Sequence, residues 1–252
     1  MKLSAKTFDP LFRLIRRVVD ICYPKQQVVG FENVPDGAAV IVGNHTQMNG
    51  PIVCELYFSE DCFTWCAGQM MNVREVPSYA FADFWSEKPL RSRWFYKILS
   101  YLIAPLSAVV FNNARTIPVY HDSRILTTFK TTVGKLKNGK RVVIFPEYAK
   151  EYNNVICDFR DRFIDVAKPY YRQTGKELSF VPMYIAPNLK KVILGKPVKF
   201  CAENPIEEER RRICDYLMNE ITGIAEACPV HRVVPYKNIP KKLYPLSIPK
   251  ER

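Results

Sequence analysis

The chain has 252 residues, of which 48% are hydrophobic and 25% are charged, and its formal net charge at pH 7 is +12. This composition excludes a fibrous or intrinsically disordered chain, because it provides enough apolar residues for one large domain or a core domain with small additions. The excess positive charge favours a polyanionic partner, whether nucleic acid, anionic lipid headgroups or a phosphorylated cofactor, without choosing among them.

The cysteines and the hydropathy pattern bear on the cellular setting. The eight cysteines are scattered and form no C-x-x-C pair, so we interpret them as structural thiols in a reducing cytosolic compartment. No signal-peptide pattern is visible at the N-terminus. The longest uncharged apolar stretch, residues 98–111, has fourteen residues and contains Pro105. A membrane-spanning helix needs about 20 residues, so we expect that the chain does not cross a membrane.

The first predicted element is an amphipathic helix over residues 8–22, with apolar side chains on one side and arginines and aspartates opposite. It either packs on its own domain or lies on an anionic membrane surface. We expect three regions: this helix within residues 1–27, an α/β domain over 28–228, and a tail rich in proline and lysine over 229–252 that shows no core pattern.

Strands alternate with helices along the rest of the chain. Runs of β-branched and apolar residues predict strands over residues 28–31, 38–42, 63–71, 116–120, 141–145, 180–185, 191–194 and 198–200. Periodicity and capping residues predict helices over residues 51–58, 94–103, 124–136 and 159–171, and a last helix that starts at a capping box of Asn204 and Glu207. Residues 72–93 are expected to form a loop or short helices. The alternation predicts an α/β fold with a mostly parallel mixed sheet flanked by helices.

Two of the predicted strands each deliver polar side chains at their carboxyl end. The strand over residues 38–42 runs into Asn44-His45, and the strand over residues 141–145 runs into Pro146-Glu147. Because the carboxyl ends of strands line the binding crevice of α/β sheets, we expect His45 to meet Glu147. A histidine at a strand end, just ahead of a helix, is well placed for proton transfer.

Four segments, in order, resemble the motifs of the phospholipid/glycerol acyltransferase family, whose best known members are the lysophosphatidic acid acyltransferases. Asn44-His45 match the start of the motif N-H-x-x-x-x-D, and Phe145-Pro146-Glu147 match the motif F-P-E-G-T-R. Between them, residues 115–120 resemble the family's apolar strand carrying an arginine. Residues 180–184 resemble its apolar strand with an early proline. The ordered set covers about residues 28–200.

The resemblance implies transfer of an acyl chain from acyl-CoA or acyl carrier protein to the hydroxyl of a lysophospholipid resembling 1-acylglycerol-3-phosphate. It implies His45 as general base and no metal or further cofactor. We expect Asn49 to complete the catalytic site, as the nearest substitute for the aspartate that the family motif has at position 50. The substrate-binding residues that it implies are Asn44, Arg115, Arg124, Glu147 and Lys150. The expected partners are the acyl donor and an anionic membrane surface, on whose cytoplasmic face the protein would lie peripherally.

The motifs also depart from the family pattern. Gly50 stands where the first motif has its aspartate, and Tyr148-Ala149-Lys150 replace Gly-Thr-Arg. Asn49 is the nearest substitute for the aspartate that orients the histidine, and a carboxylate could also fold in from elsewhere, as from Glu55, Asp61 or Asp83. The alternative is therefore a catalytically impaired protein that binds lipid or an acyl carrier on the same fold. A third hypothesis, nucleic-acid binding, rests on charge alone and is not expected, because the lysines and arginines are dispersed.

Overall fold

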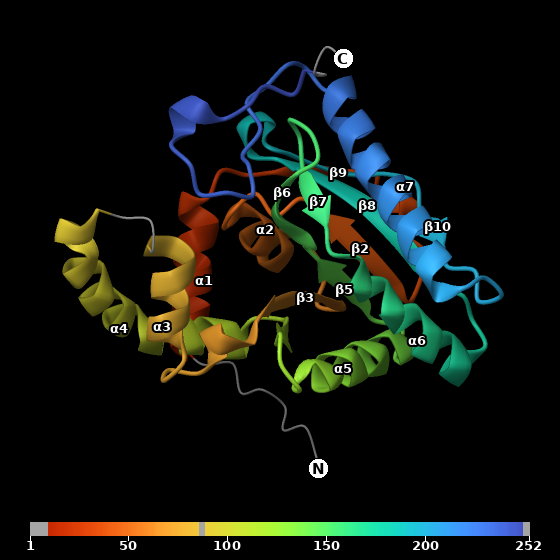
Figure 1. Ribbon diagram of the computed structural model, residues 1–252, viewed down its shortest axis with the longest axis horizontal. Helices are drawn as coiled ribbons and strands as arrows, with labels where there is room; N and C mark the ends of the chain where they lie inside the picture. The colour runs from red at the N-terminus through yellow and green to blue at the C-terminus, as the bar shows by residue number, and fades with distance from the viewer. Residues whose placement is uncertain (1–9, 86–88, 249–252) are drawn as a thin grey trace. The chain divides into compact units, whose positions relative to one another are not determined.

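The computed structural model describes residues 10–85 and 89–248 (Figure 1). The chain divides into two compact units. The first consists of Met1–Pro24 and Trp65–Thr128, and the second consists of Lys25–Thr64 and Phe129–Arg252.

The fold is α/β with a mostly parallel mixed sheet and flanking helices, as the sequence predicts. The strand order in the eight-stranded sheet is β1-β9-β8-β2-β5-β3-β4, and β10 pairs with β8. Its strands are β1 (Gln27–Val29), β2 (Ala39–Gly43), β3 (Cys62–Ala67), β4 (Thr116–Val119), β5 (Arg141–Ile144), β8 (Ser179–Ala186), β9 (Lys191–Leu194) and β10 (Val198–Lys199). A separate antiparallel hairpin consists of β6 (Glu147–Glu151) and β7 (Cys157–Phe159).

Strand β2 lies at the centre of the second unit, between β5 and β8 (Figure 1). All five of its residues are buried, which explains why the sequence shows a continuous run of apolar residues rather than an alternation. Both pairings are parallel, and Val42 lies opposite Ile144 in β5 and Pro182 in β8. The segments that follow β2 and β5 therefore leave the sheet at the same edge, which brings Asn44-His45 toward Glu147.

The helices are α1 (Pro10–Cys22), α2 (Asn49–Tyr57), α3 (Val76–Ala80), α4 (Leu90–Asn113), α5 (Ile125–Lys137), α6 (Ala167–Thr174) and α7 (Ile206–Ala227). In the second unit α7 packs on β8 and buries Ile213, Leu217 and Ile221, which share one face at helical spacing. Its start differs from the capping box expected from the sequence. Pro205 precedes the helix, and the Asn204 amide donates to Glu209 rather than pairing with Glu207.

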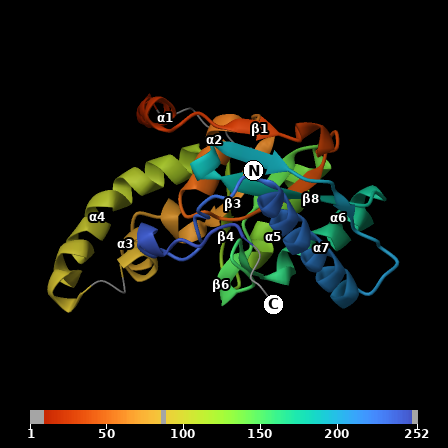
Figure 2. The same ribbon diagram turned by 90° about the horizontal axis from the view of Figure 1, so that it is seen from above.

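In the first unit, α1 and α4 expose much apolar surface. Within α1, Phe12 is buried, whereas Leu14, Val18 and Ile21 are exposed, the last by 74%. Figure 2 shows α4 as one long curved helix. Its exposed large side chains are Leu90, Trp94, Phe95, Ile98, Tyr101, Leu102 and Leu106. By length and hydropathy alone, α4 is sufficient to cross a membrane.

Helix α4 is longer than the helix over residues 94–103 that the sequence predicts. The helix continues through Pro105 to Asn113. An interior proline removes one backbone hydrogen bond and costs about 3 kcal/mol, but it does not end a helix whose remaining turns are intact. Part of residues 72–93 forms α3 and a π-helical turn over Phe81–Trp85, which agrees with the short helices expected there.

Two further expectations were wrong. The predicted helix over residues 159–171 is divided among β7, a 3₁₀ helix (Asp161–Val166) and α6, because backbone pairing with β6 takes Cys157–Phe159 into a hairpin. The tail from residue 229 does contribute to a core: His231, Val233, Val234 and Ser247 are buried in the second unit. Tertiary contacts with distant residues bury these side chains, so no local periodicity marks them.

Candidate functional site

Asn44 fixes the chain immediately after β2. Its side-chain amide donates to the Ile185 carbonyl at 3.0 Å, and its side-chain oxygen accepts the Ile185 N–H at 2.8 Å. The residue is 1% exposed, so both bonds lie in the interior beside β8. Asn44 was expected to bind substrate. In the structure its polar atoms position the His45 loop against β8.

Glu147 holds the same loop from the other side. One carboxylate oxygen accepts the backbone N–H of His45 at 2.5 Å, and the other accepts the backbone N–H of Cys157 at 2.8 Å. The side chain is 6% exposed. Burial raises the pKa of Glu147 to about 7, although both N–H bonds act in the opposite direction. The structure thus brings His45 and Glu147 together, with Glu147 bonded to backbone where the sequence suggested contact with substrate.

The His45 imidazole lies among aromatic rings. The ring of Phe145 packs edge-on at 5.4 Å between centroids, and the ring of Tyr236 does so at 5.8 Å. Burial lowers the pKa of His45 to about 4, with a smaller opposing effect from the Gln47 backbone. The imidazole is therefore neutral at pH 7. Its Nδ1 atom is buried and has no hydrogen-bond partner among the described residues.

Position 50 explains why no aspartate lies beside His45. A Cβ atom at Gly50 would lie 2.6 Å from the His45 carbonyl oxygen and 2.9 Å from Cζ of Phe145. The space that a side chain would need is thus filled by backbone and by an aromatic ring. Asn49, the expected substitute, donates its amide to the Thr46 carbonyl at 2.9 Å. No described residue hydrogen-bonds Nδ1 of His45. This holds for Asn49 and for the carboxylates of Glu55, Asp61 and Asp83 that the sequence offered as alternatives.

The turn between His45 and α2 has an unusual backbone. Thr46 and Gln47 adopt positive φ angles of 47° and 56°, which residues other than glycine seldom adopt and which cost of order 1–3 kcal/mol each. The Gln47 amide donates to the Lys237 carbonyl at 3.3 Å and to the Tyr244 hydroxyl at 3.2 Å. Contacts with the C-terminal segment therefore stabilise this strained turn.

The other predicted binding residues are paired with carboxylates or lie in the first unit. Lys150 forms an ion pair with Asp158 at 2.8 Å, and its side chain is exposed. Arg124, in the first unit, forms a bidentate pair with Asp122. Arg115 is also in the first unit, directly before β4, and is half-buried.

Sequence reasoning missed the segment over residues 229–248. His231 anchors it: the ring is within hydrogen-bonding distance of the Tyr184 hydroxyl at 2.7 Å, the Ser247 hydroxyl at 3.0 Å and the Pro229 carbonyl at 2.8 Å. This buried cluster holds the segment so that Tyr236 lies against His45. The available signal was His231-Arg232-Val233-Val234 in a proline-rich stretch, which by itself does not indicate burial.

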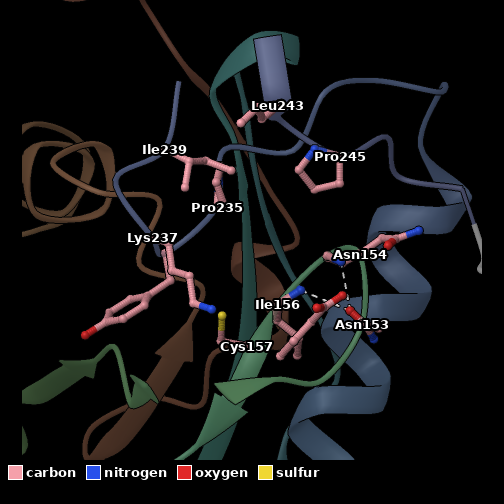
Figure 3. A pocket seen from close by; sticks show the side chains of 12 residues that line it. Asn153, Asn154, Ile156, Cys157, Pro235, Lys237, Ile239, Leu243 and Pro245 are labelled. Atoms are coloured by element: carbon pink, nitrogen blue, oxygen red, sulfur yellow. Dashed lines mark hydrogen bonds between the residues drawn. The ribbon is translucent and has the colours of Figure 1, made fainter. Parts of the chain in front are cut away.

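A pocket of about 240 Å³ lies between the β6–β7 hairpin and this segment (Figure 3). Cys157 lines it from the hairpin, and Tyr236, Lys237 and Leu243 line it from the segment. Burial raises the pKa of the Cys157 thiol to about 11. In residues 10–85 and 89–248, no group of three or more histidine, cysteine or acidic side chains is arranged to hold a metal ion.

No family model matches the chain, and no curated protein matches its sequence. Among solved structures, the chain is similar to the 1-acyl-sn-glycerophosphate (LPA) acyltransferase PlsC from Thermotoga maritima, with a TM-score of 0.47 and 16% sequence identity. The similarity covers 87% of this chain and 81% of that chain.

Proposed function

We propose that the protein is an acyltransferase that moves an acyl chain from acyl-CoA or acyl carrier protein to the hydroxyl of a lysophospholipid. One observation carries the proposal: three of the segments that resemble family motifs converge on His45. Asn44-His45 follow β2, Glu147 follows β5, and Ile185 lies in β8 directly after residues 180–184. Ile185 is hydrogen-bonded to Asn44, and Glu147 accepts the backbone N–H of His45. Segments so distant in sequence meet at the carboxyl edge of the sheet, where α/β proteins place their binding sites.

The chemistry requires a proton acceptor and a fixed geometry. The neutral imidazole of His45 would take the proton of the acceptor hydroxyl as its oxygen attacks the thioester carbonyl. The new C–O bond forms, the C–S bond breaks, and the donor leaves as a thiol that takes the proton from the imidazolium. Asn44 and Glu147 contribute by fixing the backbone of His45, which keeps the imidazole in place without touching substrate.

The second candidate is a catalytically impaired protein that binds lipid or an acyl carrier. Nδ1 of His45 has no carboxylate partner among the described residues, and Phe145 fills the space in which position 50 would supply one. In serine proteases, loss of the carboxylate that orients the histidine costs about ten thousand-fold in rate. A pKa near 4 also makes His45 a weak base at pH 7.

We further propose that the first unit lies peripherally on an anionic membrane, on its cytoplasmic face. The exposed apolar side chains of α1 and α4 support this proposal, because they would be buried among lipid chains. Arginines in the same two helices, Arg13, Arg16 and Arg17 in α1 and Arg91 and Arg93 in α4, would meet anionic headgroups.

The test is acyl transfer by the purified full-length chain. Acyl-CoA and acyl carrier protein are offered separately as donors, with lysophosphatidate in anionic vesicles as acceptor, and the diacyl product is measured by mass spectrometry. We expect product from the wild type and from His121→Ala, which changes an exposed histidine, and none from His45→Ala. If lipid binds without turnover and His45→Ala changes nothing, the second candidate is correct. If only RNA binds, both candidates fail.

A further inference from the structure

The pocket beside the C-terminal segment is lined by a lysine that forms no ion pair with any described residue. The ammonium group of Lys237 makes no hydrogen bond or ion pair with any residue in 10–85 or 89–248, and Lys237 lines the pocket. Figure 3 shows its nitrogen pointing toward the thiol of Cys157. The positive charge also acts on that thiol, because Lys237 lowers the Cys157 pKa that burial and Glu147 raise.

The cations that the sequence suggested for phosphate binding are arranged differently. Lys150 is paired with Asp158, and Arg124 is held by both carboxylate oxygens of Asp122. Each would have to give up an existing ion pair before it could bind an anion. Lys237 would not, so an anion gains the full charge-assisted hydrogen bond.

The backbone of Lys237 is also fixed. Its carbonyl oxygen accepts the Gln47 amide at 3.3 Å and the backbone N–H of Ile239 at 2.9 Å. A cation on a fixed backbone loses less conformational entropy on binding than one on a free tail.

Two residues that line the pocket, Tyr236 and Cys157, also belong to the surroundings of His45. Tyr236 lines the pocket and packs edge-on against the His45 ring. Cys157 lines it as well, and its N–H is bonded to Glu147, whose other oxygen accepts the His45 N–H. Tyr236 and Cys157 therefore connect the pocket to the surroundings of the candidate base, which does not itself line the pocket.

The size and lining of the pocket indicate a small polar anion that also carries a hydroxyl group. A volume of about 240 Å³ is below the range of roughly 300–1,000 Å³ that drug-sized ligands occupy. Besides Lys237, the carboxylate of Glu151 lines the pocket, and it can accept a hydrogen bond from a hydroxyl. Bare phosphate at neutral pH offers fewer donors for such a group than a glycerol phosphate does.

We propose that this pocket binds the glycerol phosphate headgroup of the acceptor, with Lys237 as the phosphate-binding cation. The proposal rests on the proposed acyl transfer for its biological meaning. It assigns recognition of the acceptor to a residue of the C-terminal segment rather than to the motif segments.

Headgroup binding is measured without any acyl donor, so it does not depend on turnover. Glycerol 3-phosphate and inorganic phosphate are titrated separately into the full-length protein at low salt, with calorimetric detection. The variants are Lys237→Met, which keeps the aliphatic stem and removes the charged ammonium group, and Lys242→Met, a matched change at an exposed lysine of the same segment. His45→Ala is the fourth protein.

We expect the wild type to bind glycerol 3-phosphate more tightly than inorganic phosphate. Lys237→Met should weaken the binding of glycerol 3-phosphate by about tenfold or more, since it removes a charge-assisted hydrogen bond. Lys242→Met removes the same positive charge from the same segment, but no proposed contact with the ligand. Its affinity should therefore stay within about twofold of that of the wild type.

Three results would overturn the proposal: no binding by the wild type at millimolar concentration, equal binding by Lys237→Met, or inorganic phosphate binding as tightly as glycerol 3-phosphate. The last would leave a simple anion site. His45→Ala separates this proposal from the proposed function. If the wild type and His45→Ala both bind the headgroup while the wild type catalyses no acyl transfer, the pocket assignment stands and the acyltransferase proposal fails.

Discussion

Replacing Gly50 with alanine tests whether the site beside His45 is closed. The new Cβ would lie 2.6 Å from a backbone oxygen and 2.9 Å from the Phe145 ring, contacts that a real Cβ atom essentially never makes. In an open helical position the same substitution gains up to about 1 kcal/mol from helix propensity. Overpacking in a filled interior costs about 1–3 kcal/mol. We therefore expect Gly50→Ala to lower the free energy of unfolding by about 1–2 kcal/mol.

Two other helical glycines provide matched controls. A Cβ atom at Gly134 in α5 or at Gly223 in α7 would meet nothing within 4 Å. Urea unfolding followed by circular dichroism should show that alanine at either position stabilises the protein by up to about 1 kcal/mol. If Gly50→Ala matched these controls, the reasoning about a closed site would be refuted.

The Phe145 ring can be tested as the neighbour that fills the space. In a Phe145→Ala background, Gly50→Ala should cost less than it does in the wild type, and the difference is the coupling free energy of a double-mutant cycle. For the same reason, Gly50→Asp alone should not create the aspartate–histidine pair of the family motif. We expect it to be less stable than Gly50→Ala and to show no faster acyl transfer than the wild type.

Three further predictions concern buried polar groups, each measured by urea unfolding. The pKa of His45 is about 4 in the folded state, against 6.5 for an ordinary histidine. Between these pH values the unfolded state binds one more proton than the folded state, so the free energy of unfolding falls as the pH is lowered from 6.5 to 4. That loss amounts to about 3 kcal/mol, and it should be absent in His45→Gln. In Glu147→Gln, one carboxylate oxygen is replaced by an NH2 group, which cannot accept a hydrogen bond. The backbone N–H of either His45 or Cys157 then loses its acceptor, at a cost of about 1–3 kcal/mol in the free energy of unfolding. The pKa of Glu147 is raised to about 7 in the folded state, so the folded state binds more protons than the unfolded state between pH 4.5 and 7. The wild type therefore loses stability as the pH rises through this range, and Glu147→Gln should cost more at pH 5 than at pH 8. His231→Phe leaves the buried Tyr184 hydroxyl without its ring partner, should cost about 1–3 kcal/mol, and should make residues 229–248 more sensitive to trypsin. The same pH dependence in His45→Gln as in the wild type would contradict the first argument. An unchanged free energy of unfolding in Glu147→Gln or in His231→Phe would contradict the second or the third.

Much of the second unit followed from local sequence patterns. The strands β2, β5 and β8 are buried on both faces, so each needs a short continuous apolar run that is visible in the sequence. Helix α7 shows the complementary pattern, with a buried stripe at helical spacing. The meeting of His45 with Glu147 was also predictable, because parallel neighbouring strands end at one edge of the sheet.

Other features depend on residues far apart in the chain. The hairpin β6–β7 replaced a predicted helix because backbone hydrogen bonds and the Glu147 carboxylate determine its course. The segment over residues 229–248 carries no periodic pattern, and its place depends on three hydrogen-bonding partners of one buried histidine. Local propensity contains no information on such partners.

The stretch around His45 shows where the division lies. The sequence by itself determined a buried strand that ends in Asn44-His45, a glycine at position 50 and a carboxylate at 147, because these depend on residue type and spacing alone. Only the tertiary structure decided what these residues contact. It placed Glu147 on the His45 backbone, Phe145 in the space beside Gly50, and Tyr236 against the His45 ring. Packing fills every interior space with whichever neighbour the fold brings there, and that neighbour is set by the whole chain.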